Sequence, residues 1–421
     1  MTQPAAWPDD TGLSPAAVAA QVHAGLFGES GRADPYPLYR RLRALGPVVA
    51  APDGSLMVSG YELLSALLRD HRLVKRPERF LLAFGHANWR ERPSLRLMYT
   101  SLLMSNPPVH TRLRRSVAAV FTARRVERLR PAVERIVADA CSRLDRDCDF
   151  VAGFAFPVPV NVIGELLGVP ASDRPMFQDL ARDWTMVLEN LSPAAVDRAD
   201  AAATVLSDYL SALARERALR PGDDLISAMA ASAADDDDAA DARLNGEELV
   251  TMAALLLSAG FETTTGLLSN GLVALLGHPD EAARLRASPA PELAAAAARE
   301  LLRYDSPVQI LLNRTAPEDL RVAGLDLPAG QRVTALLGGA NRDPAAFASP
   351  DRLILDRNEH PPLSFGGGIH YCVGAPLARL EAEVAFPALL ARFPRLALAG
   401  PPVRRPGIAL RGHVSLPVAT R

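Results

Sequence analysis

One long helical segment constrains the fold of this chain more than any other feature. Asn245 can cap its start, Glu248 completes a capping-box pair three residues later, and Gly277 and Pro279 end it after Leu276. The segment spans about 31 residues, or about 46 Å at 1.5 Å per residue. Because its apolar residues cover almost the whole circumference, we expect it to run through the middle of the protein.

The other segments predict a mainly α fold with a minor β region, an α+β class. Helical periodicity is present over residues 34–45, 116–144, 291–306 and from about Ala375 to Phe393, and residues 116–144 are expected to form two helices or one helix broken near Pro131. Residues 320–339 alternate between apolar and polar and are predicted to form a β-hairpin that turns at Pro328–Gly330. Hydrophobic residues make up 49% of the 421 residues, which is enough for a large core.

Charge, cysteine content and apolar run lengths exclude several classes. A net charge of −2 gives no global attraction to nucleic acid. The three cysteines form no CxxC pair, which argues against a disulfide framework and a structural zinc site. The N-terminus lacks a basic start before an apolar run, and Met252–Phe261 is far shorter than the ~20 residues of a membrane span. We expect a cytoplasmic protein without a membrane segment.

The stretch LSFGGGIHYCVGAPLARLE, residues 363–381, contains a lone cysteine, Cys372, between glycines. A helix is predicted to start just after it, and the positive end of that helix lowers a thiol pKa. Glycine-rich backbone can also bring N–H groups close to the sulfur. A single thiolate metal ligand fits this pattern, whereas a nucleophilic cysteine and a plain core thiol remain alternatives.

The segment FGGGIHYCVG resembles the haem-binding loop of the cytochrome P-450 family, Phe-Gly-x-Gly-x-His-x-Cys-x-Gly, at every fixed position. The resemblance implies that the Cys372 thiolate binds the iron of haem b. It also implies that Phe365 packs on the sulfur side, that His370 reaches a haem propionate, and that Gly374 lets the next helix begin close to the ring.

A second similar segment, AGFETT at residues 259–264, lies in the centre of the long helix. A glycine in a helix costs roughly 0.5–1 kcal/mol relative to alanine, and a carboxylate is unexpected in an apolar helix, so function is a better explanation than local stability. The family resemblance implies that Thr263 and Glu262 deliver protons and that Gly260 leaves room for O₂. A solvated surface patch is the alternative.

A third segment, ELLR, matches the Glu-x-x-Arg pattern of the family with Glu300 and Arg303. The spacing puts both side chains on one helical face, although the pattern alone is also typical of surface pairs. The resemblance implies a third, downstream member of a structural triad. Arg352 in PDRL is the predicted member, and Arg357 is the alternative.

Basic residues in two further segments match the family's contacts to the haem propionates. His110 and Arg114, in HTRLR, have the i,i+4 spacing that lets both reach one anion. Arg314, in NRTA, is the third match, beside His370 of the cysteine segment, and arginine's planar fork suits carboxylates. Taken alone, each arginine could equally be a solvated surface residue.

The resemblance covers residues 34–421 as a haem-thiolate domain, with 1–33 as an N-terminal extension. It implies a single cytochrome P-450 fold, a triangular helical domain with small sheets, like that of bacterial soluble members. By family position the substrate pocket is apolar with two polar points, Ser258 and Gln309. Its predicted lining is Leu255, Ser258, Ala259, Val308, Ile310 and Leu311.

The implied activity is insertion of one oxygen atom of O₂ into a hydrophobic small molecule, by hydroxylation or epoxidation in secondary metabolism. Oxidative coupling and desaturation are alternatives on the same fold. A non-catalytic haem sensor and a helical interaction protein without a cofactor are alternatives of other classes. Electrons are expected from NAD(P)H through a separate ferredoxin and ferredoxin reductase, because no segment resembles a reductase. A monomer is expected.

Overall fold

The computed structural model describes residues 12–118, 121–231, 244–287 and 290–420. Within these ranges the chain is mainly helical with small sheets, as predicted. The helices are α1 Pro15–Phe27, α2 Glu29–Ala33, α3 Tyr36–Ala44, α4 Tyr61–Arg69, α5 Pro77–Ala83, α6 Pro93–Tyr99, α7 Val109–Ala118, α8 Ala123–Glu127, α9 Arg130–Ser142, α10 Pro157–Leu167, α11 Phe177–Thr185, α12 Pro193–Leu219, α13 Leu225–Ala231, α14 Gly246–Leu276, α15 Pro279–Ala287, α16 Pro291–Tyr304, α17 Leu337–Ala340 and α18 Ala375–Arg392.

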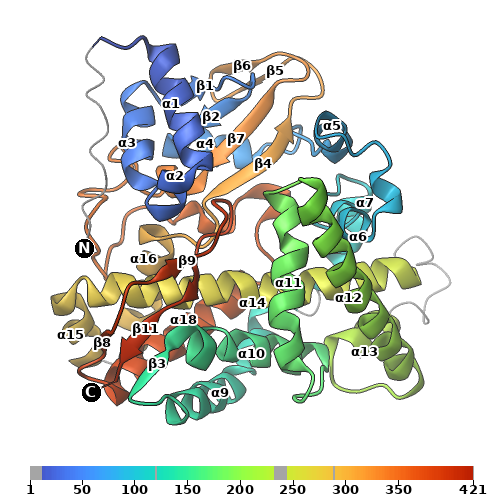
Figure 1. Ribbon diagram of the computed structural model, residues 1–421, viewed down its shortest axis with the longest axis vertical. Helices are drawn as coiled ribbons and strands as arrows, with labels where there is room; N and C mark the ends of the chain where they lie inside the picture. Colours follow the sequence, from blue (N-terminus) through green and yellow to red (C-terminus); the bar gives the residue numbers. More distant parts are fainter. Residues whose placement is uncertain (1–11, 119–120, 232–243, 288–289, 421) are drawn as a thin grey trace.

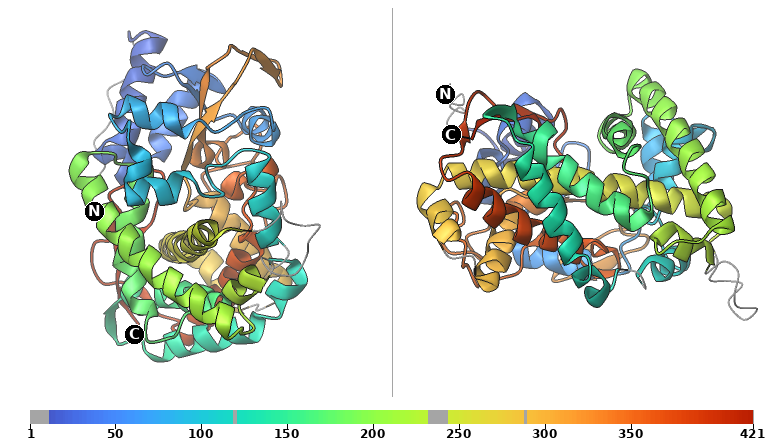
Figure 2. Two further views of the ribbon diagram at one scale, coloured as in Figure 1. Left: turned by 90° about the vertical axis from the view of Figure 1, so that its right-hand side faces the viewer. Right: turned by 90° about the horizontal axis from the view of Figure 1, so that it is seen from below.

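Helix α14 is the predicted core helix and has the predicted bounds. The Asn245 carboxamide accepts the Glu248 N–H at 2.8 Å, and the Glu248 carboxylate accepts the Asn245 N–H at 3.0 Å, which completes the capping box. Residues 251–254 and 266–272 are buried without interruption, so neighbours surround these two parts of the helix on all sides. Figure 1 shows it crossing the middle of the molecule, and the left view of Figure 2 looks along its axis.

Two glycines allow other helices to approach α14 closely. A Cβ on Gly260 would lie 2.9 Å from Ile163 of α10, and a Cβ on Gly271 would lie 2.4 Å from the Phe386 ring of α18. Helix α14 is long and apolar enough to cross a membrane by length and composition. However, 72% of its most apolar window is buried, which is typical of the core helix of a soluble fold.

The strands form one mixed sheet of four strands, in the order β1-β2-β7-β4, and three smaller groups, β3-β11-β8, β9-β10 and β5-β6. Strands β2 and β7 are parallel, whereas the other pairs are antiparallel. The strands are β1 Val48–Ala50, β2 Leu56–Val58, β3 Asp147–Asp149, β4 Ile310–Thr315, β5 Leu320–Val322, β6 Leu325–Leu327, β7 Arg332–Leu336, β8 Ala397–Leu398, β9 Val403–Arg404, β10 His413–Ser415 and β11 Pro417–Ala419.

The predicted hairpin exists, but its turn was placed wrongly. Strand β5 pairs with β6 around Ala323 and Gly324, which have φ values of 48° and 86°. Two consecutive residues with positive φ match the right-handed twist of a tight hairpin. The Pro328–Gly330 segment instead leads to β7, which pairs with β2 and β4.

Residues 15–33, part of the segment set apart above as an N-terminal extension, form α1 and α2 and join the rest of the fold. Val22 and Leu26 are fully buried in one hydrophobic cluster with Tyr39 of α3 and Ile310 of β4. This packing attaches α1 to the four-stranded sheet (Figure 1). Residues 1–11 lie outside the described ranges.

Candidate active site

The cysteine loop contains two short 3₁₀ segments, Leu363–Phe365 and Gly368–His370, and Cys372 follows the second one. Gly366 and Gly368 have φ values of 70° and 63°, which strain any other residue. A Cβ on Gly368 would also lie 2.6 Å from the Leu68 carbonyl oxygen of α4. The Cys372 N–H donates to the Phe365 carbonyl at 3.0 Å and closes the loop. The glycines therefore fix where the sulfur lies.

The Cys372 sulfur lies near N–H and guanidinium groups and also borders accessible space. Burial raises the pKa of its thiol, whereas the N–H groups of Gly374 and Ala375 and the guanidinium groups of Arg114 and Arg379 lower it. The side chain is nevertheless accessible, so it borders an open space. Donors that stabilise an anionic sulfur, next to an open position, suit a thiolate metal ligand.

Among the described residues, no group of three or more His, Cys, Asp or Glu side chains could hold a metal ion. A metal at Cys372 would therefore take most of its ligands from a cofactor. The remaining two cysteines are different in kind: Cys141 is buried in α9, where burial raises the pKa of its thiol to about 11, and burial also raises the pKa of Cys148.

Four basic side chains lie together beside the cysteine loop: His110, Arg114, Arg314 and His370. We call them the basic cluster. The imidazole rings of His110 and His370 are 4.5 Å apart between centroids. The Arg114 guanidinium donates to the Tyr371 carbonyl at 2.7 Å. The fold thus brings together four residues that come from three distant segments of the sequence.

The basic cluster has no acidic partner among the described residues. Burial, together with the nearby cations Lys75, Arg314 and Arg114 and the ring of His110, lowers the pKa of His370 to about 2. Burial lowers the pKa of Arg314 to about 10. Nε2 of His110 and Nε of Arg314 are buried, and no group in the described part of the chain is their hydrogen-bond partner. Buried donors of this kind require acceptors, and the two propionate carboxylates of a haem fit this requirement.

The centre of α14 has an accessible face in an otherwise buried helix. Ala259 is exposed and Thr263 is half-buried, whereas their neighbours Ser258 and Phe261 are buried. The Thr263 hydroxyl donates to the Ala259 carbonyl at 2.7 Å. Because this bond uses the hydroxyl proton, the oxygen can still accept a hydrogen bond from the open side.

The Glu262 carboxylate is paired with an arginine that is distant in the sequence. Its carboxylate forms an ion pair with Arg405, next to β9, an interaction that the sequence analysis missed because it spans 143 residues. The close approach of Gly260 to Ile163 gives that glycine a packing role, so its effect on O₂ binding stays a prediction.

The predicted pocket residues fall into two groups. Leu255 and Val308 are half-buried, Ala259 is exposed, and Leu311 lies 4.0 Å from the position of a Cβ on Gly366, beside the cysteine loop. Ile310 was predicted wrongly, because its side chain points to the opposite face of β4 and is buried in the cluster with α1 and α3.

The two predicted polar points of the pocket are both buried. Ser258 is 1% exposed, and its hydroxyl has no hydrogen-bond partner among the described residues. The Gln309 amide is bound to the hydroxyls of Tyr36 and Tyr39 and to the Ser306 carbonyl. Gln309 is therefore a structural residue that ties β4 to α3, and the expectation that it faces substrate was wrong.

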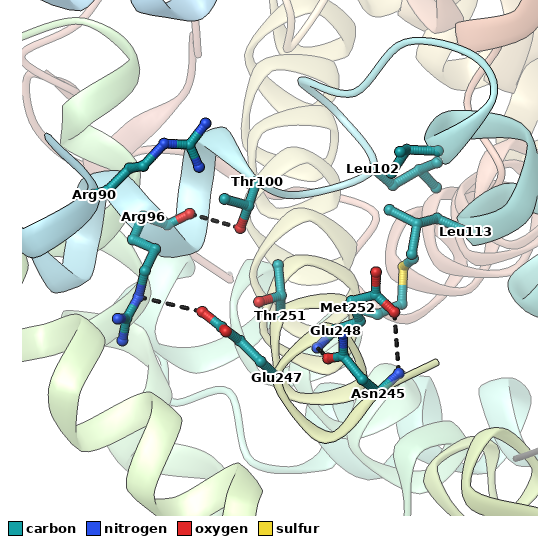
Figure 3. Close-up of a pocket in the computed structure, with 11 residues that line it drawn as sticks. Arg90, Arg96, Thr100, Leu102, Leu113, Asn245, Glu247, Glu248, Thr251 and Met252 are labelled. Atoms are coloured by element: carbon teal, nitrogen blue, oxygen red, sulfur yellow. Dashed lines mark hydrogen bonds and ion pairs between the residues drawn. The ribbon is translucent and has the colours of Figure 1, made fainter. Parts of the chain in front are cut away.

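A separate cavity of about 470 Å³ lies at the N-terminal end of α14, one turn before Leu255 (Figure 3). None of the predicted pocket residues lines it. Its lining combines apolar side chains with two arginines and two glutamates: Arg90, Arg96, Thr100, Leu102, Val109, Leu113, Asn245, Glu247, Glu248, Thr251 and Met252. Arg96 pairs with Glu247 at 3.3 Å across it.

The structural triad is present with Arg357, and the prediction of Arg352 was wrong. Glu300 pairs with Arg303 at 2.7 Å and with Arg357 at 3.2 Å. The Arg352 side chain is exposed, and only its carbonyl contributes, by accepting from Arg303 at 3.0 Å. The Glu300 carboxylate also accepts the Ile354 N–H at 2.9 Å. Satisfying its oxygens in this way makes a buried charged group tolerable.

The site combines a glycine-rich loop that carries one accessible sulfur with a basic cluster that has no acidic partner among the described residues, and together these features indicate one class of protein. This class binds an anionic metal cofactor through one cysteine. Comparisons with known proteins identify the family. The sequence model described as Cytochrome P450 matches residues 291–402.

Two curated relatives and one solved structure illustrate the match. The chain is 40% identical over 413 residues to cytochrome P450 monooxygenase PikC of Streptomyces venezuelae, over 94% of each protein. It is 36% identical over 405 residues to 6-deoxyerythronolide B hydroxylase of Saccharopolyspora erythraea, over 93% of this chain and 98% of that one. P450BioI in complex with an acyl carrier protein ligated to hexadec-9Z-enoic acid has a TM-score of 0.84 and 32% identity, over 93% of this chain and all of that one.

The chain belongs to the cytochrome P450 family. It is a haem-dependent monooxygenase, an oxidoreductase that inserts one oxygen atom of O₂ into a hydrophobic small molecule, of the type used in bacterial secondary metabolism. Like other bacterial members, it requires a substrate, O₂ and redox partners.

Proposed function

We propose that this protein hydroxylates or epoxidises a hydrophobic natural product such as a polyketide or a peptide, with Cys372 as iron ligand and the basic cluster holding the haem propionates. The main support is the combination at one site of an accessible sulfur with unpaired buried donors on His110 and Arg314. The bound haem would supply oxygen activation, which thiolate ligation favours. The relative named for 6-deoxyerythronolide B supports a macrolide-like substrate class.

The chain's own residues position substrate and protons in this proposal. The accessible face of α14 around Ala259 borders the substrate together with Val308 and Leu311. Thr263 accepts a hydrogen bond at the reacting side, and Glu262 supplies protons after it leaves Arg405. Electrons come from NAD(P)H through a ferredoxin and its reductase in the cytoplasm, and the protein acts as a monomer.

The function is tested with haem-loaded protein and a panel of macrolide lactones, other polyketides and cyclic peptides. A substrate should shift the spin state of the haem in its absorption spectrum. With O₂, a surrogate ferredoxin and reductase, mass spectrometry should then find a product one oxygen atom heavier. Haem-containing protein that shows neither a spin shift nor turnover across the panel would favour a sensor, and colourless protein would oppose haem binding altogether.

Replacing Thr263 with alanine should uncouple electron use from product formation. The change removes the hydroxyl that donates to the Ala259 carbonyl in the half-buried centre of α14. We expect haem and substrate binding to be kept, product per NAD(P)H to fall about tenfold or more, and peroxide to rise. Thr263→Ser keeps the hydroxyl and should stay coupled. Full coupling in the alanine variant would remove Thr263 from proton delivery.

An arginine-rich surface on α7 and α8 is the proposed ferredoxin site. Arg115 and Arg124 are exposed and make no ion pair with a described residue. Arg125, by contrast, lies 3.7 Å from Asp223. Arg115→Glu with Arg124→Glu should slow reduction by an acidic ferredoxin about tenfold at low salt, because complementary charge mainly sets association rates.

The matched control for this surface is Arg198→Glu on α12, since Arg198 is also exposed but lies on a different element. Stopped-flow reduction rates at several salt concentrations compare the variants, with substrate spin shifts as a check on folding. Equal rates for the double variant and the control would place the ferredoxin elsewhere.

A further inference from the structure

The sequence contains one lysine, Lys75, among 46 lysine and arginine residues. Lys75 is also buried, with 6% of its surface exposed. Within the described residues, its ammonium group has neither a hydrogen bond nor an ion pair. A buried cation without a partner is costly, and lysines are almost never buried unless they are paired. A chain that otherwise uses arginine throughout therefore has an unexplained lysine in its interior.

The backbone of Lys75 is fixed from two sides. The Asn106 side chain accepts the Lys75 N–H at 2.7 Å and donates to the Lys75 carbonyl at 2.8 Å. The preceding residue, Val74, exchanges two backbone hydrogen bonds with Thr315, next to Arg314 in β4. The Asn106 carboxamide makes both bonds because its oxygen accepts and its NH₂ group donates. Lys75 is thus held between the start of α7 and β4.

The Lys75 ammonium lies among other basic groups. Burial and then the charge of Arg314 lower its pKa to about 7. Lys75 in turn is the largest electrostatic contribution, after burial, to the lowered pKa of His370, ahead of Arg314, His110 and Arg114. The charged and titratable groups that cause these two shifts, on β4, the cysteine loop and α7, are all basic.

We propose that Lys75 binds a haem propionate as a fifth member beside the basic cluster, and that Asn106 is the positioning residue that aims it there. This inference rests on the proposed assignment of the cluster to the propionates. Two carboxylates would give the buried His110 Nε2 and Arg314 Nε the acceptors that the described residues do not supply. The same carboxylates would accept from the Lys75 ammonium, for which the described residues also provide no acceptor.

Haem binding should then be linked to protonation of Lys75. A nearby carboxylate raises the pKa of the ammonium above its value of about 7 in the haem-free chain. The attraction is complete below that value, and it is lost as the pH rises through the higher pKa of the haem-bound protein. The haem-loaded protein should therefore release haem faster at alkaline pH.

The test measures transfer of haem from the loaded protein to excess apomyoglobin between about pH 6 and pH 10, for wild type, Lys75→Met, Lys75→Arg and Asn106→Asp. We expect Lys75→Met to release haem about tenfold faster near pH 6 and to lose the alkaline rise. Lys75→Arg should restore slow release and keep it at alkaline pH. Asn106→Asp loses the donor to the Lys75 carbonyl, so its rate of haem release should lie between those of wild type and Lys75→Met.

If Lys75 had a purely structural role, Lys75→Met would change the rate of haem release in the opposite direction or not at all. Methionine has a similar volume and removes the cost of burying a charge, so release from Lys75→Met would then be unchanged or slower. The propionate bending band in resonance Raman spectra gives a second readout and should move only if Lys75 contacts a propionate. Unchanged release and an unmoved band in Lys75→Met would overturn the inference. Wild-type protein without haem would instead overturn the proposed function itself.

Discussion

Cys372→His is expected to abolish the thiolate-type absorption of the ferrous carbon monoxide complex and to reduce monooxygenase activity to background. Burial raises the pKa of the Cys372 thiol, and the Gly374 and Ala375 N–H groups and the Arg114 guanidinium oppose that rise by stabilising an anionic sulfur. A neutral imidazole cannot use these donors in the same way, and it donates less electron density to iron than a thiolate does. A backbone hydrogen bond from the Cys372 N–H to the Phe365 carbonyl also closes the loop, which leaves little freedom to reposition the larger imidazole ring.

Absorption spectra of the reduced, CO-treated proteins measure this effect directly. Cys148→Ser is the matched control, because Cys148 is also partly accessible but lies in β3, outside the loop. The control should keep the wild-type spectrum. If Cys372→His kept the thiolate-type band, Cys372 could not be the iron ligand, and the main support for the proposed site would be lost.

Glu300→Ala should destabilise the fold by about 3–5 kcal/mol, the cost of leaving buried charges without their partner. Glu300 is 3% exposed, and its carboxylate holds Arg303, Arg357 and the Ile354 N–H. Arg303 is only 1% exposed, so solvent cannot replace the lost carboxylate. Chemical unfolding of the haem-loaded protein, followed by circular dichroism and by haem absorption, measures the change.

Two arginine variants separate the alternatives for the third triad member. Arg357→Ala should be strongly destabilising because it removes a direct partner of Glu300. Arg352→Ala should change stability by less than about 0.5 kcal/mol, as is usual for an exposed side chain that contributes only its carbonyl. Equal losses in both variants would contradict the assignment of Arg357.

The sequence predicted features that local chemistry determines. The bounds of α14 follow from a capping box at Asn245 and a glycine after Leu276, all within one turn of each end. The glycines of the cysteine loop are required by positive φ at Gly366 and Gly368, so their pattern could be read without a structure. The basic cluster was predictable only through the family resemblance, because its members come from separate segments.

Features set by long-range packing were not predictable in this way. The choice between Arg352 and Arg357 depends on how an irregular segment folds back over α16, not on sequence spacing. Ile310 and Leu311 are both apolar neighbours on one strand, and only the sheet decides which face meets the core. Lys75 belongs to no motif that the sequence analysis used, and its position depends on hydrogen bonds between its backbone and the Asn106 side chain.

The ion pair between Glu262 and Arg405 has a consequence for protein engineering. It joins the centre of α14 to the C-terminal strands, so these two parts have to be inherited together in recombined P450 sequences. A chimera that kept this α14 but took its C-terminal segment from a relative without an equivalent arginine would leave a nearly buried carboxylate without its partner. Crossover points for such libraries are therefore better placed before α14 than between it and β9.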